Sequence, residues 1–259
     1  MERIDGRAPT ELRPIQIHPF FLRQPLGSAL IEWGQTRVLI AVNLEDRVPA
    51  FLQGTGQGWI SAEYTLLSRA GGSRVTSSLG GSGAGRAVEI RRLIGRSLRA
   101  AIDPFVLGER TLWVDCDVLE ADGGTRVAAI TGGFVALTLA LDRMVRQGLI
   151  ETWPVRTMIA AISAGIVRDA PLIDLNYFED SQADVDANFV MTPSGECVEV
   201  QLTGEHQTLA PSRLMALLQL AWQGLRQIFQ MQIDVLQPHL MPDHAERLHA
   251  LLTLPEVLP

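Results

Sequence analysis

The sequence predicts an α/β or α+β fold in which mixed sheets pack against helices. Short apolar segments typical of strands stand before, between and after long segments whose apolar residues recur at helical spacing. Apolar residues make up 47% of the 259 residues and charged residues 20%. A chain of this composition can bury a substantial core, so global disorder is excluded.

The first hundred residues contain short predicted strands joined by turns. Residues 28–33 and 37–43 flank Gly34-Gln35-Thr36, a gap of hairpin length that contains a glycine. Residues 59–67 form a further predicted strand. Residues 71–85 hold six glycines and four serines. This composition predicts a mobile loop, a kind of segment that often carries function.

The centre of the chain alternates helix and strand. Residues 88–102 repeat apolar side chains at helical spacing, and residues 111–119 predict a strand. The turn Asp122-Gly123-Gly124 then leads into a long helical pattern over residues 125–146, closed by Gly148. A strand is therefore expected to turn directly into a helix at this point.

The C-terminal half begins with predicted strands over residues 158–167 and 173–177. Residues 188–192 and 197–203 flank a Pro-Ser-Gly-Glu turn and predict a hairpin. A helix follows over residues 211–233, and its proline stands in the first turn, where the missing N–H costs nothing.

The pattern breaks after residue 233, which divides the chain into a core domain, residues 1–233, and a C-terminal appendage, residues 234–259. Pro238 and Pro242 interrupt the helical register here. A short helix is expected from Asp243, because Glu246 stands three residues later in capping-box spacing.

Several chemistries are excluded by what the sequence lacks. All 22 basic residues are arginine, so a Schiff-base lysine and a phosphate-loop lysine are absent. The five histidines form no ligand motif, and no G-x-G-x-x-G or G-x-S-x-G motif is present. Of the two cysteines, Cys116 alternates with apolar residues and is expected to be buried. A polar N-terminus and no apolar run near 20 residues predict a cytoplasmic protein without a membrane segment.

Positive charge is concentrated in one segment of an acidic chain. Residues 69–99 hold seven arginines against one acid, Glu89, so this segment carries +6; the rest of a chain of net charge −7 carries −13. Such an asymmetry focuses an anionic ligand on one place. The alternative is a solvated, arginine-rich helix face.

Two predicted helix beginnings each carry an arginine. Gly124-Thr125-Arg126 lies where a strand turns into a helix, and Gly85-Arg86 stands at the start of the arginine-bearing helix. The free N–H groups of a first helical turn attract anions, as does the positive end of the helix dipole. Brought together, the two would clamp one phosphate from two sides. The alternative at each is an ordinary turn with its arginine facing solvent.

A carboxylate cluster is the second candidate site. Glu179-Asp180-Ser181 is followed closely by Asp184, Asp186 and Asn188. Mg²⁺ needs only one or two carboxylates when substrate phosphates complete its shell, and a carboxyl group can also protonate a leaving oxygen. Asp180 and Asp186 would supply the pair; the alternative is an acidic surface loop.

Long motifs follow one another along most of the chain. The most specific runs over residues 115–126, Asp-Cys-Asp-Val-Leu-Glu-Ala-Asp-Gly-Gly-Thr-Arg. The others are Asp5-Gly6-Arg7, Arg13-Pro14, residues 56–64, residues 89–96, Glu179-Asp180-Ser181, Asp186-Ala187-Asn188 and Val190-Met191-Thr192. In order and spacing they resemble the bacterial ribonuclease PH family over about residues 1–233.

This resemblance implies a nucleotidyltransferase that trims the 3′ ends of tRNA precursors by phosphorolysis and releases nucleoside diphosphates. The implied fold is the core shared with ribosomal protein S5 domain 2, and the implied assembly is a homohexamer, a trimer of dimers. The implied phosphate-binding residues are Arg86, Gly124, Thr125 and Arg126. Asp180 and Asp186 match the acidic pair that binds Mg²⁺ or Mn²⁺ and, with Arg126, acts in catalysis.

RNA contacts are expected from the arginines of the basic segment, and one departure from the family bears on them. The expected residues are Arg69, Arg74, Arg92, Arg96 and Arg99. Relatives usually carry further basic residues between Arg74 and Arg86, where this chain has Thr76-Ser77-Ser78 and a glycine run. Fewer phosphate contacts predict weaker affinity for tRNA.

The competing hypothesis is a non-catalytic or hetero-oligomeric ring subunit of exosome type that binds RNA. The presence of Arg86, Thr125, Arg126, Asp180 and Asp186 argues against it, because inactive partners tend to lose these residues. The preferred RNA, the metal, and which aspartate acts as acid or ligand stay open at this point.

Overall fold

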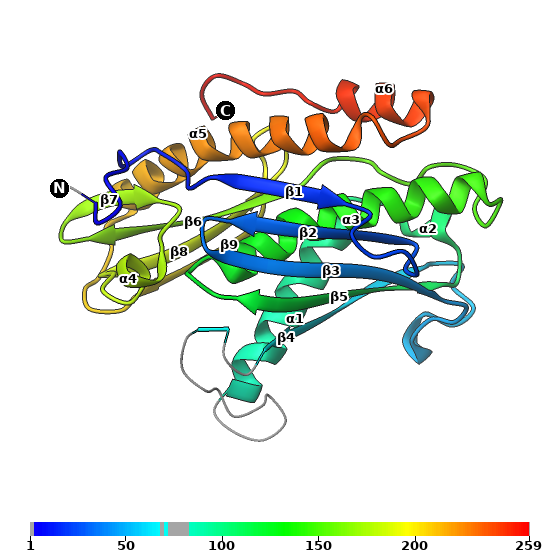
Figure 1. The fold of residues 1–259 in the computed structure, drawn as a ribbon, viewed down its shortest axis with the longest axis horizontal. Coiled ribbons are helices and arrows are strands. Elements are labelled where there is room, and N and C mark those ends of the chain that lie inside the picture. The colour runs from blue at the N-terminus through cyan, green and yellow to red at the C-terminus, as the bar shows by residue number, and fades with distance from the viewer. Residues whose placement is uncertain (1–2, 68–69, 72–82, 259) are drawn as a thin grey trace.

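Nine strands in two sheets and six helices make up the computed structural model, which describes residues 3–67, 70–71 and 83–258 (Figure 1). The first sheet has the spatial order β1-β2-β3-β5-β4 and the second β7-β6-β8-β9. The strands are β1 Ile15–Pro19, β2 Gly27–Trp33, β3 Thr36–Glu45, β4 Trp59–Leu66, β5 Thr111–Glu120, β6 Ala160–Val167, β7 Ala170–Ile173, β8 Val185–Met191 and β9 Cys197–Gly204. The helices are α1 Gly83–Ala100, α2 Pro104–Leu107, α3 Thr125–Arg146, α4 Tyr177–Asp180, α5 Pro211–Leu236 and α6 Pro242–Ala250, with a short 3₁₀ turn at Ala50–Leu52.

The first sheet combines a hairpin with a parallel crossover. Strands β2 and β3 pair from Trp33 to Thr36, which leaves a two-residue turn in which Gly34 has a φ of +59°. Such a turn requires left-handed backbone, which glycine adopts without strain. Strands β4 and β5 run parallel, and α1 lies in the connection between them.

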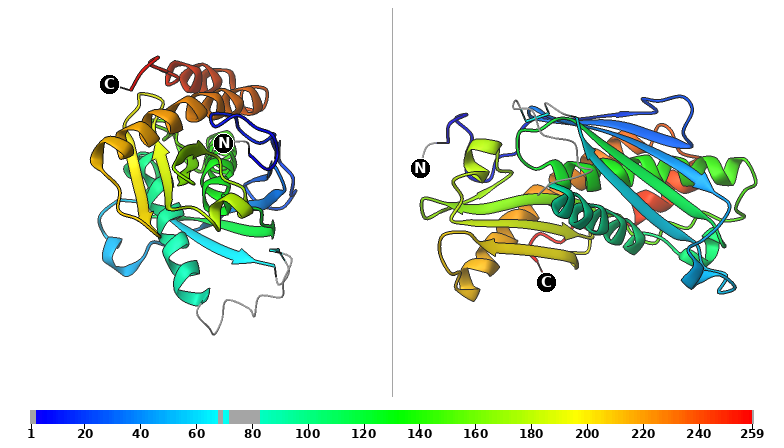
Figure 2. Two further views of the ribbon diagram at one scale, coloured as in Figure 1. Left: turned by 90° about the vertical axis from the view of Figure 1, so that its left-hand side faces the viewer. Right: turned by 90° about the horizontal axis from the view of Figure 1, so that it is seen from below.

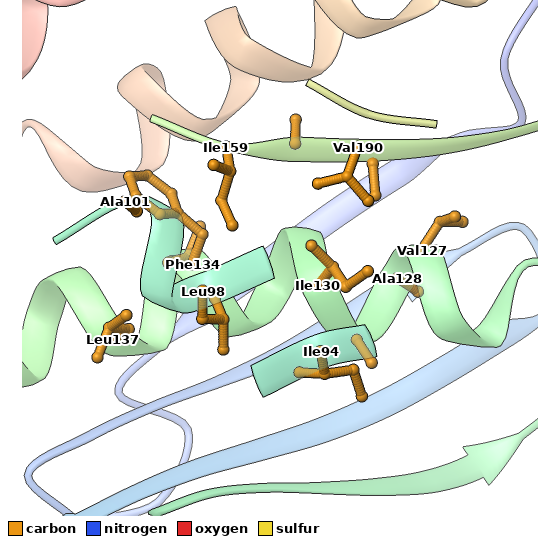
Figure 3. Close-up of a cluster of buried hydrophobic side chains, with 14 of the residues drawn as sticks. Ile94, Leu98, Ala101, Val127, Ala128, Ile130, Phe134, Leu137, Ile159 and Val190 are labelled. Atoms are coloured by element: carbon orange, nitrogen blue, oxygen red, sulfur yellow. The ribbon is translucent and has the colours of Figure 1, made fainter. Parts of the chain in front are cut away.

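Helix α3 lies between the two sheets and forms the centre of the core (Figure 2). Ile130 and Phe134 of α3 are buried, with Ile159 and Val190 on the side of the second sheet (Figure 3). Ile94 of α1 covers the opposite side. Helix α5 packs on the other face of β6, so every residue of that strand is buried. This layering fixes the N-terminus of α3 at the edge where both sheets meet.

Helix α3 differs from one expectation. Among the described residues it is the one helix long and apolar enough to span a membrane. The expectation that no apolar run approaches that length was therefore wrong. The helix is almost entirely buried inside the protein, as expected for the central helix of a core.

Most predicted elements are confirmed, with boundaries within a few residues. The confirmed elements are the strands predicted at residues 28–33, 37–43, 59–67, 111–119 and 158–167, the hairpin of residues 188–192 and 197–203, and the helices over residues 125–146 and 211–233. The α/β fold class and its mixed sheets are confirmed as well. Cys116 is 1% exposed, and burial raises the pKa of its thiol.

Two element predictions were wrong. The helix predicted from Val88 begins at Gly83, because glycine's penalty in a helix is only about 1 kcal/mol and the buried face of α1 already starts at Ala87. The predicted mobile loop therefore overlaps α1 at residues 83–85, and its residues 72–82 lie outside the described residues. The strand predicted over residues 173–177 ends at Ile173, since Asp174 adopts a φ of +51°.

The C-terminal segment packs on the core rather than extending from it. Helix α5 continues to Leu236, and Leu240 and Leu248 join the main hydrophobic core. The buried His244 ring donates from Nδ1 to Asp142 of α3 at 2.7 Å and stacks on Trp153. The expected Asp243 cap is wrong: the N-cap of α6 is Met241, and Pro242 occupies the first turn. The division at residue 233 stays a prediction.

Candidate active site

The turn before α3 is held from both sides by side-chain hydrogen bonds. The Thr36 hydroxyl donates to the carbonyl of Gly123 at 2.7 Å and accepts from the Asp122 N–H at 2.9 Å. The Arg13 guanidinium donates to the Asp122 carbonyl. Gly124 is the N-cap of α3 in left-handed conformation, with a φ of +68°. The first N–H groups of α3 are thus presented at a fixed, glycine-lined turn.

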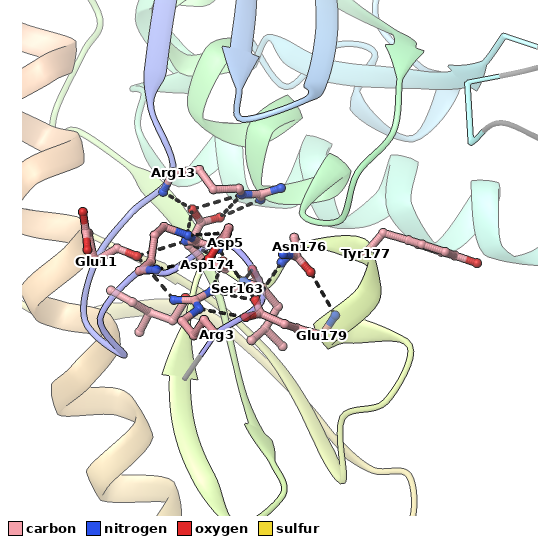
Figure 4. Close-up of polar contacts among 12 residues, drawn as sticks. Arg3, Asp5, Glu11, Arg13, Ser163, Asp174, Asn176, Tyr177 and Glu179 are labelled. Carbon is pink, nitrogen blue, oxygen red and sulfur yellow. Dashed lines mark hydrogen bonds and ion pairs between the residues drawn. The ribbon is translucent and has the colours of Figure 1, made fainter. Parts of the chain in front are cut away.

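Helix α4 is a single turn that carries Asp180, and its position depends on a buried ion pair. Asn176 and Glu179 form a capping box, and Glu179 is only 2% exposed. Arg3 contacts both carboxylate oxygens of Glu179, at 2.8 and 2.7 Å (Figure 4). A one-turn helix is too short to be stable alone, so these contacts fix where Asp180 lies.

The same network ties the chain's N-terminal segment to the site. Asp174 is fully buried and lies 2.6 Å from Arg13 and 3.2 Å from Arg7 (Figure 4). Arg13 also lies 3.6 Å from the Asp122 carboxylate, so one guanidinium joins the strand end before α4 to the turn before α3. The motifs around Asp5 and Arg13 that carry the family resemblance therefore have a structural role in this protein.

Close packing brings the turn of α3 against α4. A Cβ at Gly123 would lie 2.6 Å from the Leu175 carbonyl oxygen, so only glycine fits this contact. The Tyr177 N–H, in the first turn of α4, donates to Asp122 at 3.2 Å. Because these segments touch, the anion-binding end of α3 and the carboxylate of Asp180 belong to one site.

Asp186 completes the carboxylate pair from the beginning of β8, where it pairs with Gly165 and Thr203. Burial, followed by the negative charge of Asp180, raises the pKa of Asp186 to about 6. Burial also raises the pKa of Asp180, and the charges of Arg126 and Arg86 act in the opposite direction on both aspartates. Two carboxylates and two guanidinium groups thus share one electrostatic environment.

The arginine side of the site is linked by a glutamine. Arg126 donates from Nη1 to Gln201 Oε1 at 3.1 Å, and Gln201 Nε2 donates to Glu89 Oε1 at 3.3 Å. Glu89 lies one turn after Arg86 on α1. Gln201 of β9 therefore joins the beginning of α3 to the beginning of α1.

The structure brings together all six residues predicted to bind phosphate or metal. These residues are Arg86, Gly124, Thr125, Arg126, Asp180 and Asp186. Sequence reasoning assigned no role to three further neighbours. Tyr64 forms a hydrogen bond with Thr125, and Gln201 accepts one from Arg126. The negative charge of Glu205 helps to raise the pKa of both aspartates.

The predicted RNA-binding arginines differ in their surroundings. Arg92 is exposed, and Arg96 forms a 2.7 Å ion pair with Glu199. Arg99 donates to the Ile60 carbonyl at 2.8 Å and lies 4.0 Å over the Trp59 ring, and its contact with RNA stays a prediction. This half-buried guanidinium is occupied by the protein itself. Arg69 and Arg74 lie outside the described residues.

The carboxylate pair suits a divalent cation that takes most of its ligands from substrate or water. Within residues 3–67, 70–71 and 83–258, no cluster of three or more potential ligand side chains is present. In the same ranges no hydrogen-bond donor contacts the carboxylate of either Asp180 or Asp186, and both pKa values are raised. Mg²⁺ commonly binds through one or two carboxylates with phosphates, which fits this pair.

Comparison with known proteins matches both halves of the chain to one family. The model of the 3′ exoribonuclease family, domain 1, matches residues 11–141, and that of domain 2 matches residues 157–224. The chain belongs to the 3′ exoribonuclease family. Family membership confirms the predicted resemblance, and with it a phosphorolytic 3′-to-5′ exoribonuclease of the nucleotidyltransferase type.

Individual members of the family are similar over nearly the whole chain. Ribonuclease PH of Syntrophomonas wolfei is 50% identical over 237 residues, which cover 91% of this chain and 99% of the relative. Ribonuclease PH of Bacillus cereus strain AH187 is 49% identical over 236 residues, 90% of this chain and 96% of the relative. The similarity therefore extends over nearly the whole length of these relatives.

Two solved structures share the fold at low sequence identity. The Archaeoglobus fulgidus exosome with RNA bound to the active site aligns with a TM-score of 0.77 at 24% identity, over 88% of this chain and 92% of that chain. Rice Rrp46 aligns with a TM-score of 0.73 at 21% identity, over 90% of this chain and 100% of that chain. At these identities the likeness shows the common fold of the family.

Proposed function

We propose that this exoribonuclease removes nucleotides from the 3′ end of RNA with orthophosphate held by Arg86, Gly124, Thr125 and Arg126. One observation carries the assignment: the turn that begins α3 packs against α4, which carries Asp180, while Gln201 joins Arg126 to Glu89, one turn after Arg86. Orthophosphate and a phosphodiester repel each other, so their reaction needs positive groups fixed between them. This site provides two guanidinium groups and a helix N-terminus at one place.

The proposed reaction is an in-line displacement at phosphorus. An oxygen of orthophosphate attacks the phosphorus that links the last nucleotide to the preceding one. A P–O bond forms, the bond to the O3′ of the preceding nucleotide breaks, and the last nucleotide leaves as a nucleoside diphosphate. The departing O3′ takes the electron pair and a proton, which the Asp180 and Asp186 pair is placed to supply.

Asp180 and Asp186 are also the residues proposed to hold Mg²⁺ or Mn²⁺. When bound, the ion supplies positive charge next to the phosphoryl oxygens that become more negative during the reaction. The positions of the two aspartates do not depend on the ion, because α4 and β8 fix their backbones. Arg126, held by Gln201, faces the same oxygens in this proposal.

The proposed substrates are the 3′ ends of tRNA precursors, acted on by a homohexamer in the cytoplasm. The name ribonuclease PH on relatives at 50% and 49% identity supports the substrate class. Large exposed apolar side chains support self-assembly, since a ring interface would cover such groups. They include Phe20, Phe21, Phe51, Phe105 and Phe178.

The decisive experiment follows the products from a short 3′-extended RNA with Mg²⁺, with and without orthophosphate. Nucleoside diphosphates that appear only with phosphate support the proposal. Monophosphates released without phosphate would instead identify a hydrolase. A sizing column run on the purified chain alone separates self-assembly from dependence on a second chain.

A further inference from the structure

A buried tyrosine lies directly behind the proposed phosphate site. Tyr64 of β4 is 2% exposed, and its hydroxyl oxygen lies 2.8 Å from Thr125 Oγ1. Thr125 is the first residue of α3, so this contact places the phenol at the beginning of that helix, next to Arg126.

The direction of the hydrogen bond between the two hydroxyls decides whether Thr125 presents a hydrogen or a lone pair to an anion. Each hydroxyl has one hydrogen and two lone pairs. If the Thr125 hydrogen pointed to Tyr64, Thr125 would face the anion with lone pairs, which repel it. If Tyr64 donates instead, the Thr125 hydrogen is free to donate to a phosphate oxygen.

The surroundings of Tyr64 favour the second arrangement when an anion is bound. Burial raises the pKa of Tyr64, so the phenol keeps its hydrogen at neutral pH. A bound anion needs donors, and the hydrogen bonds of a buried chain of hydroxyls strengthen one another when they all point the same way. Tyr64 to Thr125 to phosphate is such a chain.

We propose that Tyr64 is a positioning residue for orthophosphate. Tyr64 donates its hydroxyl hydrogen to Thr125 and thereby directs the Thr125 hydrogen to the anion. This inference rests on the proposed function, because it assigns the phosphate site of that reaction. It concerns phosphate affinity rather than the chemical step. The effect is expected in the KM and Kd for phosphate and not in kcat at saturating phosphate.

The test measures phosphate affinity by calorimetry, and the KM for phosphate in parallel, on single and double variants. Tyr64→Phe removes one oxygen and is expected to weaken phosphate binding about 5-fold, the usual effect of one neutral hydrogen bond. The kcat at saturating phosphate is expected to stay within about 2-fold. The matched control is Tyr177→Phe, the same change at the only other tyrosine, which is 64% exposed.

A double-mutant cycle separates positioning from general loosening of the fold. In a Thr125→Val background, Tyr64→Phe is expected to have no further effect on phosphate affinity, whereas in a Thr125→Ser background the 5-fold loss is expected to persist. An equal loss in both backgrounds, an unchanged affinity in Tyr64→Phe, or a loss confined to kcat would each overturn the inference. Wild-type release of monophosphates without phosphate would overturn the proposed function, which is a separate readout. Thermal unfolding of each variant checks that the fold is kept.

Discussion

The carboxylate side of the site is fixed by buried ion pairs, whereas its arginine side is held by partly exposed hydrogen bonds. Glu179 and Asp174 are buried beside Arg3 and Arg13, which places Asp180 through α4. Arg126 is held by a hydrogen bond from Nη1 to Gln201, and Arg86 is exposed on the first turn of α1. The difference fits the two proposed tasks: an acid–base pair needs fixed geometry, while groups that receive a mobile RNA and a free anion must stay accessible.

The largest expected effect comes from breaking the buried side. Glu179→Ala leaves Arg3 buried without its carboxylate and removes half of the capping box, so the free energy of unfolding should fall by about 3–5 kcal/mol. Urea unfolding measures it. The matched control is Arg213→Ala, which removes an exposed 2.7 Å pair with Asp169 and should cost less than about 1 kcal/mol. Equal costs for the two variants would refute the proposed difference between the sides.

The buried carboxylate pair should lower the free energy of unfolding once Asp186 is ionised. The pKa of Asp186 is raised to about 6, whereas an aspartate in the unfolded chain ionises near pH 4. The contribution of protonated Asp186 to the free energy of unfolding is therefore fully present below about pH 4. It is lost as the pH rises through about 6 and the carboxyl group ionises inside the folded protein. Asp186→Asn should raise the free energy of unfolding by up to about 3 kcal/mol at pH 8 and leave it unchanged at pH 3.5.

The measurement for Asp186→Asn is urea unfolding at several pH values with a chelator present, which keeps divalent cations from masking the repulsion. The same variant should lose phosphorolysis by about 100-fold or more, because a general acid–base group is removed. A gain in stability together with a loss of activity is the signature of a strained catalytic group. A variant that is less stable than wild type at pH 8 would contradict the assignment of Asp186 as an electrostatically unfavourable carboxylate.

The arginine side should respond in binding rather than in stability. Gln201→Ala removes the contact that holds Arg126 and breaks the link to Glu89. The KM for phosphate should rise about 5-fold, roughly 1 kcal/mol, since one partly exposed hydrogen bond is lost. The free energy of unfolding should change by less than about 0.5 kcal/mol. Gln230→Ala, which loses an exposed bond to Asp234, is the matched control and should change neither quantity.

What the sequence could predict follows from how local each feature is. The Gly124 turn and the start of α3 were predictable because adjacent residues determine them. The carboxylate pair was indicated by the close spacing of acidic residues over 179–186, and the family resemblance matched it. Asn176 and Glu179 also carried a capping-box signal, but alternating Ile173, Leu175 and Tyr177 favoured a strand at the same place.

Other parts of the site depend on contacts between distant segments. Tyr64 and Thr125 are 61 residues apart, and Arg126 and Gln201 are 75 residues apart, so no spacing in the chain indicates either contact. The contacts of Arg99 have the same origin. Helical periodicity places an arginine on a face, but it does not show that a long side chain folds back over Trp59.

The smallest predicted effect distinguishes arginines that face RNA from those used by the fold. Arg92 is exposed, while Arg99 is bonded to Ile60 and stacked on Trp59. If Arg92 contacts an RNA phosphate, log affinity should fall less steeply with log salt concentration in Arg92→Ala. The magnitude of the slope should decrease by about 1, because one counterion fewer is released. Arg99→Ala should leave that slope unchanged and instead lower stability, since it removes packing on Trp59. Binding of a 3′-extended tRNA over a salt series measures both variants, and an equal change in slope would show that the contact with Trp59 opens when RNA binds.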